Sequence, residues 1–192
     1  MPGDPVSRFQ DLLERARSIE DGEPETMALA TVDKRGRPSV RMMHLDGVDA
    51  LGFLFHTNYE SRKGQELACH PQAALCFHWP SLAIQVRVEG RVERTSAEES
   101  DAFFACQPHV HQVAAWASRQ SAALGERGEL LDRLRETEAR FLDGPIPRPS
   151  HFGGYRLVPE RIEFWHRYEH RLHDRRVFTR SADGWTESRL YP

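Results

Sequence analysis

The chain has 192 residues, of which 29% are charged, and its formal net charge is −3. This length favours one compact domain, residues 1–192, with a sizeable core to which dimer contacts can add. Without a block of positive charge, neither nucleic acid nor a membrane surface is expected as the main partner, and a small molecule or a protein fits better.

The first half of the chain combines one helix with a series of strands. Apolar residues at helical spacing predict a helix over 9–19, which a turn at 21–24 ends. Strands over 26–32 and 38–45 form a hairpin, and a short helix over 59–70 separates strands over 52–58 and 72–79. Alternation from Leu82 to Val88 predicts a half-buried strand, with a bulge at Gly90. We therefore assign an N-terminal helix and linker to 1–24 and barrel strands to 26–94.

The second half begins with a helical insertion. Ser96 and Glu99 form a capping box before a helix through 101–106, and a second helix over 128–141 is stopped by Gly144. Prolines 145, 147 and 149 force an extended linker. Strands over 152–158 and 161–166 and a hairpin of 172–180 with 185–190 follow. The insertion at 96–144 and the C-terminal strands at 145–192 predict a mainly β, antiparallel α+β barrel.

The cysteine pattern favours a reducing compartment. Cys69, Cys76 and Cys106 are odd in number and form no CxxC pair, so we expect small buried hydrophobic residues rather than disulfides. The chain also opens without a signal-peptide pattern and has no apolar run of membrane-spanning length. A cytoplasmic protein is the simplest interpretation.

Phosphate binding, if present, must use side chains. The sequence has no GxGxxG, GxxxxGK[ST] or GxSxG motif. Arg41, Arg62 and Lys63 fall at strand ends or at the start of the short helix, where guanidinium groups and helix amides bind dianions. Taken alone, these residues are more typical of a solvated basic surface.

Three histidines, His166, His170 and His173, have a spacing that would suit a metal on a helix. Their surroundings are strand-like, so the rings would not converge, and we expect no metal site. In a strand, Arg171 and His173 would share one face and form a clamp for a planar substrate. His166 fits a histidine stacked on a core aromatic residue.

Eight ordered segments together resemble the pyridoxine 5'-phosphate oxidase family of FMN-dependent split-barrel oxidases. They are 30–33 (ATVD), 57–64 (TNYESRKG), 85–90 (QVRVEG), 116–121 (WASRQS), 147–149 (PRP), 153–156 (GGYR), 162–165 (IEFW) and 171–175 (RLHDR). The resemblance runs from about residue 4 to residue 192. It implies an obligate homodimer with two FMN sites at the subunit interface.

The resemblance also implies a set of site residues. Arg171 and His173 match the substrate-side pair over the flavin. The cofactor would be bound by Arg41, Met42, Met43, His44, His56, Thr57, Arg62, Lys63, Gln85, Gln120, Ser121, Trp165 and Arg175, some of them from the second subunit. Tyrosine is usual where this chain has His56.

The chain departs from the family where the family grips the phosphate of its substrate. A lysine, a tyrosine, an arginine and a serine do so in the family, and these positions hold Asp46, Phe103, Gln107 and His111. Exchanging lysine for aspartate turns attraction into repulsion, worth about 4 kcal/mol for a contact pair at an effective dielectric of about 20. The basic N-terminal arm that often precedes the first helix in the family is also missing.

Three hypotheses follow. The first is an FMN-dependent oxidase acting on an unphosphorylated, amine-bearing or partly reduced ring, as in the phenazine-biosynthesis relatives of the family; hydride would pass to flavin N5 and O2 would reoxidise the flavin to yield hydrogen peroxide. The second is an orthodox pyridoxamine or pyridoxine 5'-phosphate oxidase whose substrate phosphate is held by His109, His111 and Arg119. The third is a non-catalytic flavin-binding protein, which the retained 171–175 segment disfavours.

Overall fold

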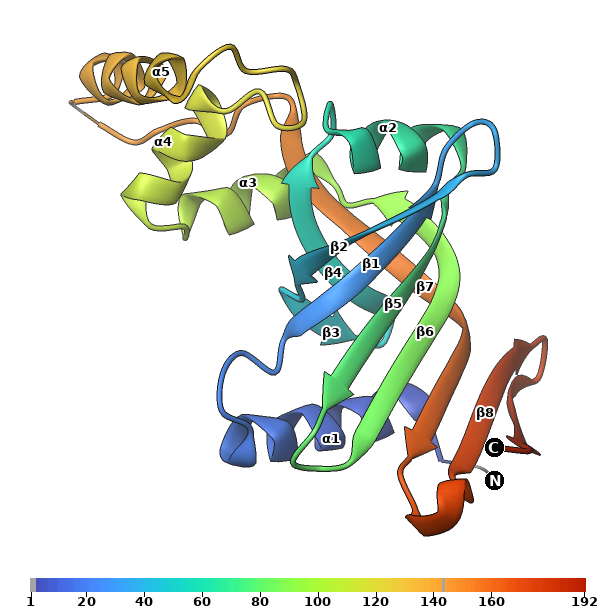
Figure 1. The fold of residues 1–192 in the computed structure, drawn as a ribbon. Helices are drawn as coiled ribbons and strands as arrows, with labels where there is room; N and C mark the ends of the chain where they lie inside the picture. The colour runs from blue at the N-terminus through green and yellow to red at the C-terminus, as the bar shows by residue number, and fades with distance from the viewer. Residues whose placement is uncertain (1–2, 143) are drawn as a thin grey trace.

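The computed structural model describes residues 3–142 and 144–192, so the first two residues of the expected N-terminal segment and residue 143 of the expected insertion lie outside the described residues. Figure 1 shows a sheet with a helix below it and a helical lobe above. In chain order the elements are α1 (Pro5–Ile19), β1 (Thr26–Val32), β2 (Pro38–His44), β3 (Gly47–Asp49), β4 (Gly52–Asn58), α2 (Arg62–Cys69), β5 (Gln72–Trp79), β6 (Ile84–Arg94), α3 (Ala97–Ala105), α4 (His109–Ala117), α5 (Arg127–Arg140), β7 (Phe152–His166), the 3-10 turn η1 (Glu169–Arg171), β8 (Asp174–Ser181) and β9 (Gly184–Leu190).

The strands form one curled antiparallel sheet. Its order is β2-β1-β5-β6-β7-β4-β3, and β8 pairs with β7 and with β9. The predicted hairpins are present, since Thr26 faces His44 across β1 and β2 and Arg180 faces Trp185 across β8 and β9. The prediction of a mainly β, antiparallel α+β barrel with added helices is confirmed.

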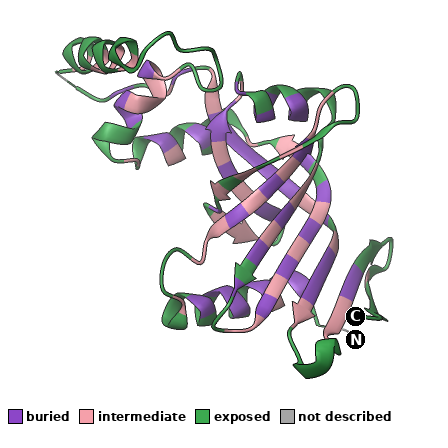
Figure 2. Ribbon diagram, in the orientation of Figure 1, coloured by how far each residue is buried: buried purple, intermediate pink, exposed green. Residues whose placement is uncertain are grey.

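The main core lies between the concave face of the sheet and α1. Asp4 caps α1 by accepting hydrogen bonds from the backbone of residues 6 and 7, and Pro5 occupies the first helical position, where no amide is needed. The ring centroid of Phe9 lies 4.9 Å from that of Phe53 and 4.8 Å from that of Phe77. Figure 2 shows buried and less buried residues alternating along the strands, as expected when one face packs and the other does not.

A second, smaller core holds the helical lobe together. It consists of Phe104, Val113 and Ile146, with Leu134 and Phe141 packed against them. The capping box predicted at the start of α3 is present, because Ser96 and Glu99 each accept the backbone N–H of the other. No residue of α5 is fully buried, so α5 packs on this lobe through a narrow stripe.

The two strands predicted over 152–158 and 161–166 are one continuous strand, β7. It passes Pro159 because the register shifts opposite it, between Glu89 and Gly90, which confirms the predicted bulge. A side chain on Gly90 would overlap the carbonyl of Val158, so glycine is needed there.

The prediction that Arg171 and His173 share one face of a strand is wrong. Residues 169–171 form η1, in which His170 and Arg171 have φ of 56° and 61°, and β8 begins only at Asp174. The strand signal came from the flanking apolar residues, whereas the segment between them is a left-handed turn.

Two further expectations need correction. Cys69 and Cys106 are exposed and Cys76 is half-buried, so the cysteines are not all buried hydrophobic residues. His166 is half-buried at the end of β7, and the histidine that packs on an aromatic ring nearby is His173, against Trp165. Within residues 3–142 and 144–192, no helix is long and apolar enough to cross a bilayer.

Candidate functional site

Lys63 is the centre of a polar cluster at the upper end of the sheet. Its side chain is 7% exposed, and Nζ donates to Thr57 Oγ1 at 3.1 Å and to Gln120 Oε1 at 2.9 Å. Burial, reinforced by the positive charge of Arg41, lowers the pKa of Lys63 to about 8. Three residues predicted to bind a cofactor, from β4, α2 and the loop after α4, therefore meet at one point.

Arg41 lies beside this cluster and is held in place by Glu66. Its guanidinium donates to Thr31 Oγ1 at 2.6 Å and to Glu66 Oε2 at 3.2 Å. Arg62, one turn before Glu66 on α2, donates from Nε to Glu66 Oε1 at 2.9 Å. The hydrogen bonds from Thr31, Ser39 and Arg62 outweigh the effect of burial and lower the pKa of Glu66 to about 2. Glu66, which sequence reasoning missed, thus fixes both arginines, and its position four residues after Arg62 was the available signal.

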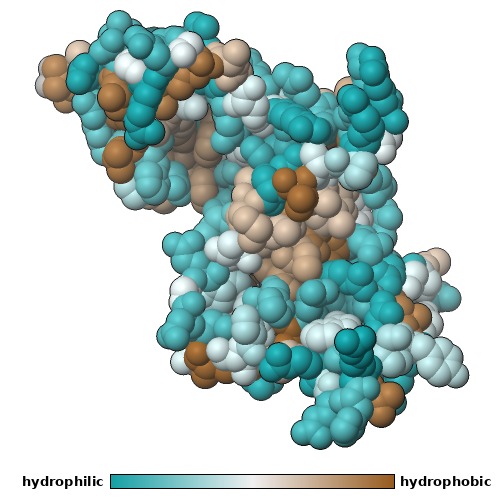
Figure 3. Space-filling model, viewed as in Figure 1, coloured by the Kyte–Doolittle hydropathy of each residue, from teal (hydrophilic) through white to brown (hydrophobic). Residues whose placement is uncertain are grey.

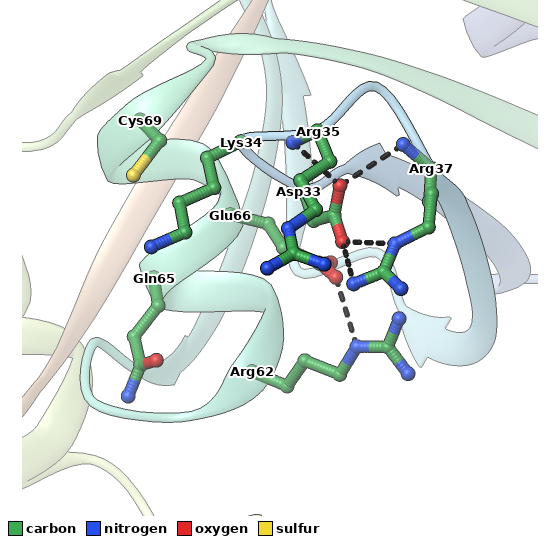
Figure 4. Close-up of a pocket in the computed structure, with 8 residues that line it drawn as sticks. All are labelled: Asp33, Lys34, Arg35, Arg37, Arg62, Gln65, Glu66 and Cys69. Atoms are coloured by element: carbon green, nitrogen blue, oxygen red, sulfur yellow. Dashed lines mark hydrogen bonds and ion pairs between the residues drawn. The ribbon is translucent and has the colours of Figure 1, made fainter.

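A cavity between α2 and the hairpin turn adjoins this region and is drawn in Figure 4. It has a volume of about 330 Å³ and is lined by residues of the 33–37 turn and of α2, including Arg62. Asp33 accepts hydrogen bonds from the backbone and the side chain of Arg37, which lowers the pKa of Asp33 to about 2. The two carboxylates that line this cavity are each paired with an arginine of their own element, Asp33 with Arg37 in the turn and Glu66 with Arg62 in α2.

Three further cavities follow one another through shared lining residues. The first, about 610 Å³, is lined mostly by polar residues, among them two arginines and one glutamate: Asn58, Glu60, Arg62, Gln65, Arg119, Gln120, Ser121 and Ala122. It shares Asn58 and Gln120 with a second of about 370 Å³, which also contains Met43, Thr57, His111 and several alanines. The second shares His56 with a third of about 220 Å³. In this series of three cavities, the polar 610 Å³ cavity with its two arginines is therefore followed by the less polar 370 Å³ cavity.

The third cavity brings together all four residues at the altered phosphate-grip positions. Its lining residues are Asp46, His56, Phe103, Phe104, Gln107, His111 and Phe152. The His56 ring lies flat on Phe103, with centroids 3.4 Å apart and planes 1° apart. These residues come from β4, the loop before β3, α3, the loop after it, α4 and the start of β7, and no sequence spacing relates them.

The four residues predicted along β2 do not all face the same way. Burial alternates along the strand, with Arg41 and Met43 half-buried and Met42 and His44 exposed on the opposite face. Only Met43 of the two methionines lines the 370 Å³ cavity. Ser121 lies in the loop after α4 with φ of 70°, a backbone conformation that non-glycine residues adopt mainly where surroundings enforce it.

The remaining predicted residues form a row across β6, β7 and β8 at the lower end of the sheet. Gln85 faces Trp165, and Trp165 faces Arg175. The Arg175 Nε donates to the fully buried Glu163 at 2.8 Å, and Glu163 also pairs with Arg87 at 2.6 Å. Hydrogen bonds from these arginines and Arg161 outweigh burial and lower the pKa of Glu163 to about 2. Sequence reasoning missed Glu163, which orients Arg175.

Arg171 and His173 lie next to this row. The ring of His173 packs on Trp165 with centroids 4.5 Å apart. Its Nδ1 accepts the backbone N–H of Tyr168 at 3.2 Å, so a neutral His173 carries its proton on Nε2. Arg171 is exposed on η1.

The two halves of the predicted site are far apart within one chain. Thr57 pairs with Gly153 near the start of β7, and Gln85 pairs with Trp165 near its end. Those positions on β7 are twelve residues apart, or up to about 40 Å at about 3.3 Å per residue. The two halves are therefore separated by most of the length of β7.

Comparison with known proteins identifies the family. The model described as "Pyridoxamine 5'-phosphate oxidase" matches residues 12–141, and that of the "Pyridoxine 5'-phosphate oxidase C-terminal dimerisation region" matches 152–192. The chain belongs to the pyridoxamine 5'-phosphate oxidase family. Its dimerisation region supports a homodimer.

Relatives within the pyridoxamine 5'-phosphate oxidase family fall into two groups. Proteins named pyridoxine/pyridoxamine 5'-phosphate oxidase from Myxococcus xanthus and Anaeromyxobacter dehalogenans are 52% and 53% identical, covering 100% and 98% of this chain and 93% and 96% of theirs. Among solved structures, PhzG from Burkholderia lata 383 in complex with tetrahydrophenazine-1-carboxylic acid is 31% identical, with a TM-score of 0.94, covering 100% of this chain and 94% of its own. A pyridoxamine 5'-phosphate oxidase-related, FMN-binding protein from Nostoc punctiforme, at 19% identity and TM-score 0.76 over 97% and 96% of the two chains, shares the fold.

Proposed function

We propose that this member of the pyridoxamine 5'-phosphate oxidase family is an FMN-dependent oxidase whose flat, aromatic or partly reduced substrate carries no phosphate. The observation that carries this proposal is Asp46 in the 220 Å³ cavity, beside Phe103, Gln107 and His111. No lysine or arginine is among the described residues lining that cavity. A phosphate dianion placed there would meet a carboxylate and no permanent cation.

The hydrogen-bond donors of the 610 Å³ cavity and of the Lys63 cluster suit the phosphate of FMN. Arg62, Arg119 and the Lys63 cluster supply cations and amide groups, and the first amides of α2 add helix N-terminal donors. The neighbouring cavity with Met43 and the alanines is less polar, as a flat ring requires. We propose that Lys63, Arg62, Thr57, Gln120 and Ser121 bind the phosphate and ribityl end, and that Arg41, Met43 and the β2 backbone lie along the ring.

The second half of the site is proposed to come from the partner subunit. Separation of Gln85, Trp165 and Arg175 from the Lys63 cluster by most of the length of β7 supports this division. The edge strand β2 exposes Val40 and Met42, and Figure 3 shows hydrophobic residues gathered where Figure 1 draws β1 and β2. An exposed apolar edge of this kind is typical of a subunit interface.

The proposed reaction is a two-electron oxidation. FMN, when bound, supplies the electron acceptor that takes a hydride from the substrate and passes two electrons to dioxygen, which with two protons becomes hydrogen peroxide. Arg171 and the Nε2–H of His173 would orient the substrate through hydrogen bonds, since Tyr168 and Trp165 fix the His173 ring. Closure of the site between two subunits would exclude water.

The second candidate is an orthodox pyridoxine/pyridoxamine 5'-phosphate oxidase. Relatives with that name at 52–53% identity over nearly the whole chain favour it. The alternative phosphate grip is not gathered in one place, however, because His111 and Arg119 line different cavities and His109 lines neither. Loss of one attractive contact pair costs about 4 kcal/mol, and reversal of the charge costs more, roughly a thousandfold or more in affinity.

The test is a comparison of substrates on the purified, flavin-loaded dimer. Hydrogen peroxide production would be measured with pyridoxamine 5'-phosphate, with pyridoxamine, and with a tetrahydrophenazine carboxylic acid. We expect no preference for the phosphorylated over the unphosphorylated vitamer. A kcat/KM for pyridoxamine 5'-phosphate that exceeds the other two by a hundredfold or more would establish the second candidate instead. A colourless protein that does not take up FMN would contradict both.

A further inference from the structure

The 220 Å³ cavity has an organised carboxylate at its wall. The backbone N–H of His56 donates to Asp46 Oδ2 at 2.7 Å, and Nδ1 of the same histidine lies 2.8 Å from the same oxygen. Asp46 is an exposed residue, but its side chain keeps only 17% of its surface exposed. The carboxylate is therefore held in one orientation by two contacts on one of its oxygens.

The other oxygen of Asp46 is available to a ligand. In the part of the chain that the structure describes, Oδ1 accepts no hydrogen bond, and Nδ1 of the exposed His44 lies 3.5 Å from it. A carboxylate oxygen can accept two hydrogen bonds, so Oδ1 has acceptor capacity that a donor in the cavity can use. A ligand that donates to Oδ1 would satisfy it.

The remaining walls suit a positive charge. Phe103 and Phe152 are aromatic, and an aromatic ring attracts a cation through its quadrupole. The His56 ring that lies flat on Phe103 is only 7% exposed, so this wall is rigid. Gln107 offers an amide oxygen, and His111 in neutral form adds one further acceptor. The cavity thus combines one fixed anion with aromatic faces and neutral acceptors.

We propose that this cavity binds a protonated amino group of the substrate, with Asp46 Oδ1 as its main acceptor. The proposal rests on the proposed function in that the cavity belongs to the substrate site. It adds that the substrate position that carries phosphate elsewhere in the family carries a cation here. Asp46 is then a specificity-determining residue that selects for ammonium as well as against phosphate.

The experiment measures binding of three matched probes to the flavin-loaded dimer by isothermal titration calorimetry: 2-phenylethylammonium, 2-phenylethanol and 2-phenylethyl phosphate. We expect the ammonium probe to bind most tightly. Asp46→Asn removes the charge but keeps the size, and should weaken the ammonium probe about ten- to hundredfold while leaving the alcohol unchanged. The matched control Asp183→Asn, in the exposed turn between β8 and β9, removes the same charge and should change nothing.

A second variant keeps the test decisive if Asp46→Asn fails to fold. Gln107→Lys adds a cation to the cavity without touching the contacts between Asp46 and His56, and should also weaken ammonium binding. Equal affinity of the wild-type protein for alcohol and ammonium would overturn the proposal. So would an ammonium preference that survives in both variants. Because calorimetry needs no turnover, loss of the ammonium preference alone leaves the peroxide assay of the proposed function unaffected.

Discussion

Lys63 Nζ lies 2.9 Å from Oε1 of Gln120, which joins the start of α2 to the loop after α4. The same ammonium also donates to Thr57 Oγ1 on β4. The upper half of the proposed cofactor site is therefore fixed by a buried amine whose pKa is lowered to about 8. A bound phosphate would favour the charged form of this amine.

We predict that FMN affinity falls as the pH rises through about 8. In the flavin-free protein Lys63 loses its proton above this pH, and binding a phosphate dianion must then restore it, which weakens affinity by up to about tenfold per pH unit. Fluorescence titration of the flavin-free protein between pH 6.5 and 9.5 would measure the decline. Arginine in Lys63→Arg keeps its charge over this pH range, so the FMN affinity of that variant should depend less on pH. An equally steep decline in that variant would show that another group titrates.

Gly64 is predicted to be essential for the position of α2. A side chain at this buried residue would overlap the backbone carbonyls of Tyr59 and Asn58, and backbone cannot yield as a flexible side chain can. Gly64→Ala should therefore lower the free energy of unfolding by about 2–4 kcal/mol and reduce FMN retention by shifting Lys63. Urea unfolding and the ratio of flavin to protein absorbance would measure both effects.

Gly128→Ala is the matched control. Gly128 lies in the first turn of α5, where a side chain would meet only ordinary contacts. Alanine should stabilise the helix by about 0.5–1 kcal/mol and leave flavin content unchanged. If both variants behave alike, the close approach at Gly64 does not position α2.

Glu163 is predicted to lose its stabilising effect in acid. Its pKa is lowered from 4.5 to about 2, so its contribution, on the order of 3 kcal/mol, is complete above about pH 4.5 and is lost as the pH falls towards 2. Glu163→Gln should be destabilised at pH 7, because three arginines lose their shared partner, and its stability should fall less between pH 5 and pH 3. Urea unfolding at fixed protein concentration would compare the two; parallel pH curves would contradict the assignment.

The local features of this fold were predictable from the sequence, and the long-range ones were not. The capping box at Ser96 is signalled by residues three positions apart and the bulge at Gly90 by one glycine in a strand pattern, and both are confirmed. The helix α4 was missed because Pro108 precedes it without a side-chain cap. The sequence predicts a strand at His170 and Arg171, where the structure has a left-handed turn, because no local signal distinguishes these two residues from extended ones.

The candidate site shows the same limit. A resemblance to a family supplied the residues, yet the flat stacking of His56 on Phe103 and the contact of Lys63 with Gln120 join elements about 50 residues apart. Such contacts depend on how the helical lobe packs on the sheet, and no periodicity in the sequence predicts that packing. The roles of these residues remain predictions that the variants here are designed to test.

Two substitutions in the 220 Å³ cavity should enable it to bind a substrate phosphate. Asp46→Lys combined with Gln107→Arg puts two cations into the 220 Å³ cavity and should raise affinity for pyridoxamine 5'-phosphate by about a hundredfold or more. Perturbation of the flavin absorbance spectrum would report the dissociation constant. Affinity for unphosphorylated pyridoxamine serves as the control and should not rise. No gain for the phosphorylated compound would mean that these positions do not face the substrate.

The proposed sharing of each site by two subunits predicts complementation between two defective chains. Lys63→Ala damages the upper half of the site and Arg175→Ala the lower half, so each homodimer should retain little FMN. In a mixed dimer, one site combines both damaged halves and the other combines both intact halves. Co-expression with two different tags and tandem purification should therefore yield mixed dimers with about half of the wild-type flavin content, since one intact site remains. If each site lay within one subunit, every site would carry one defect. The mixed dimer would then retain as little flavin as the two homodimers.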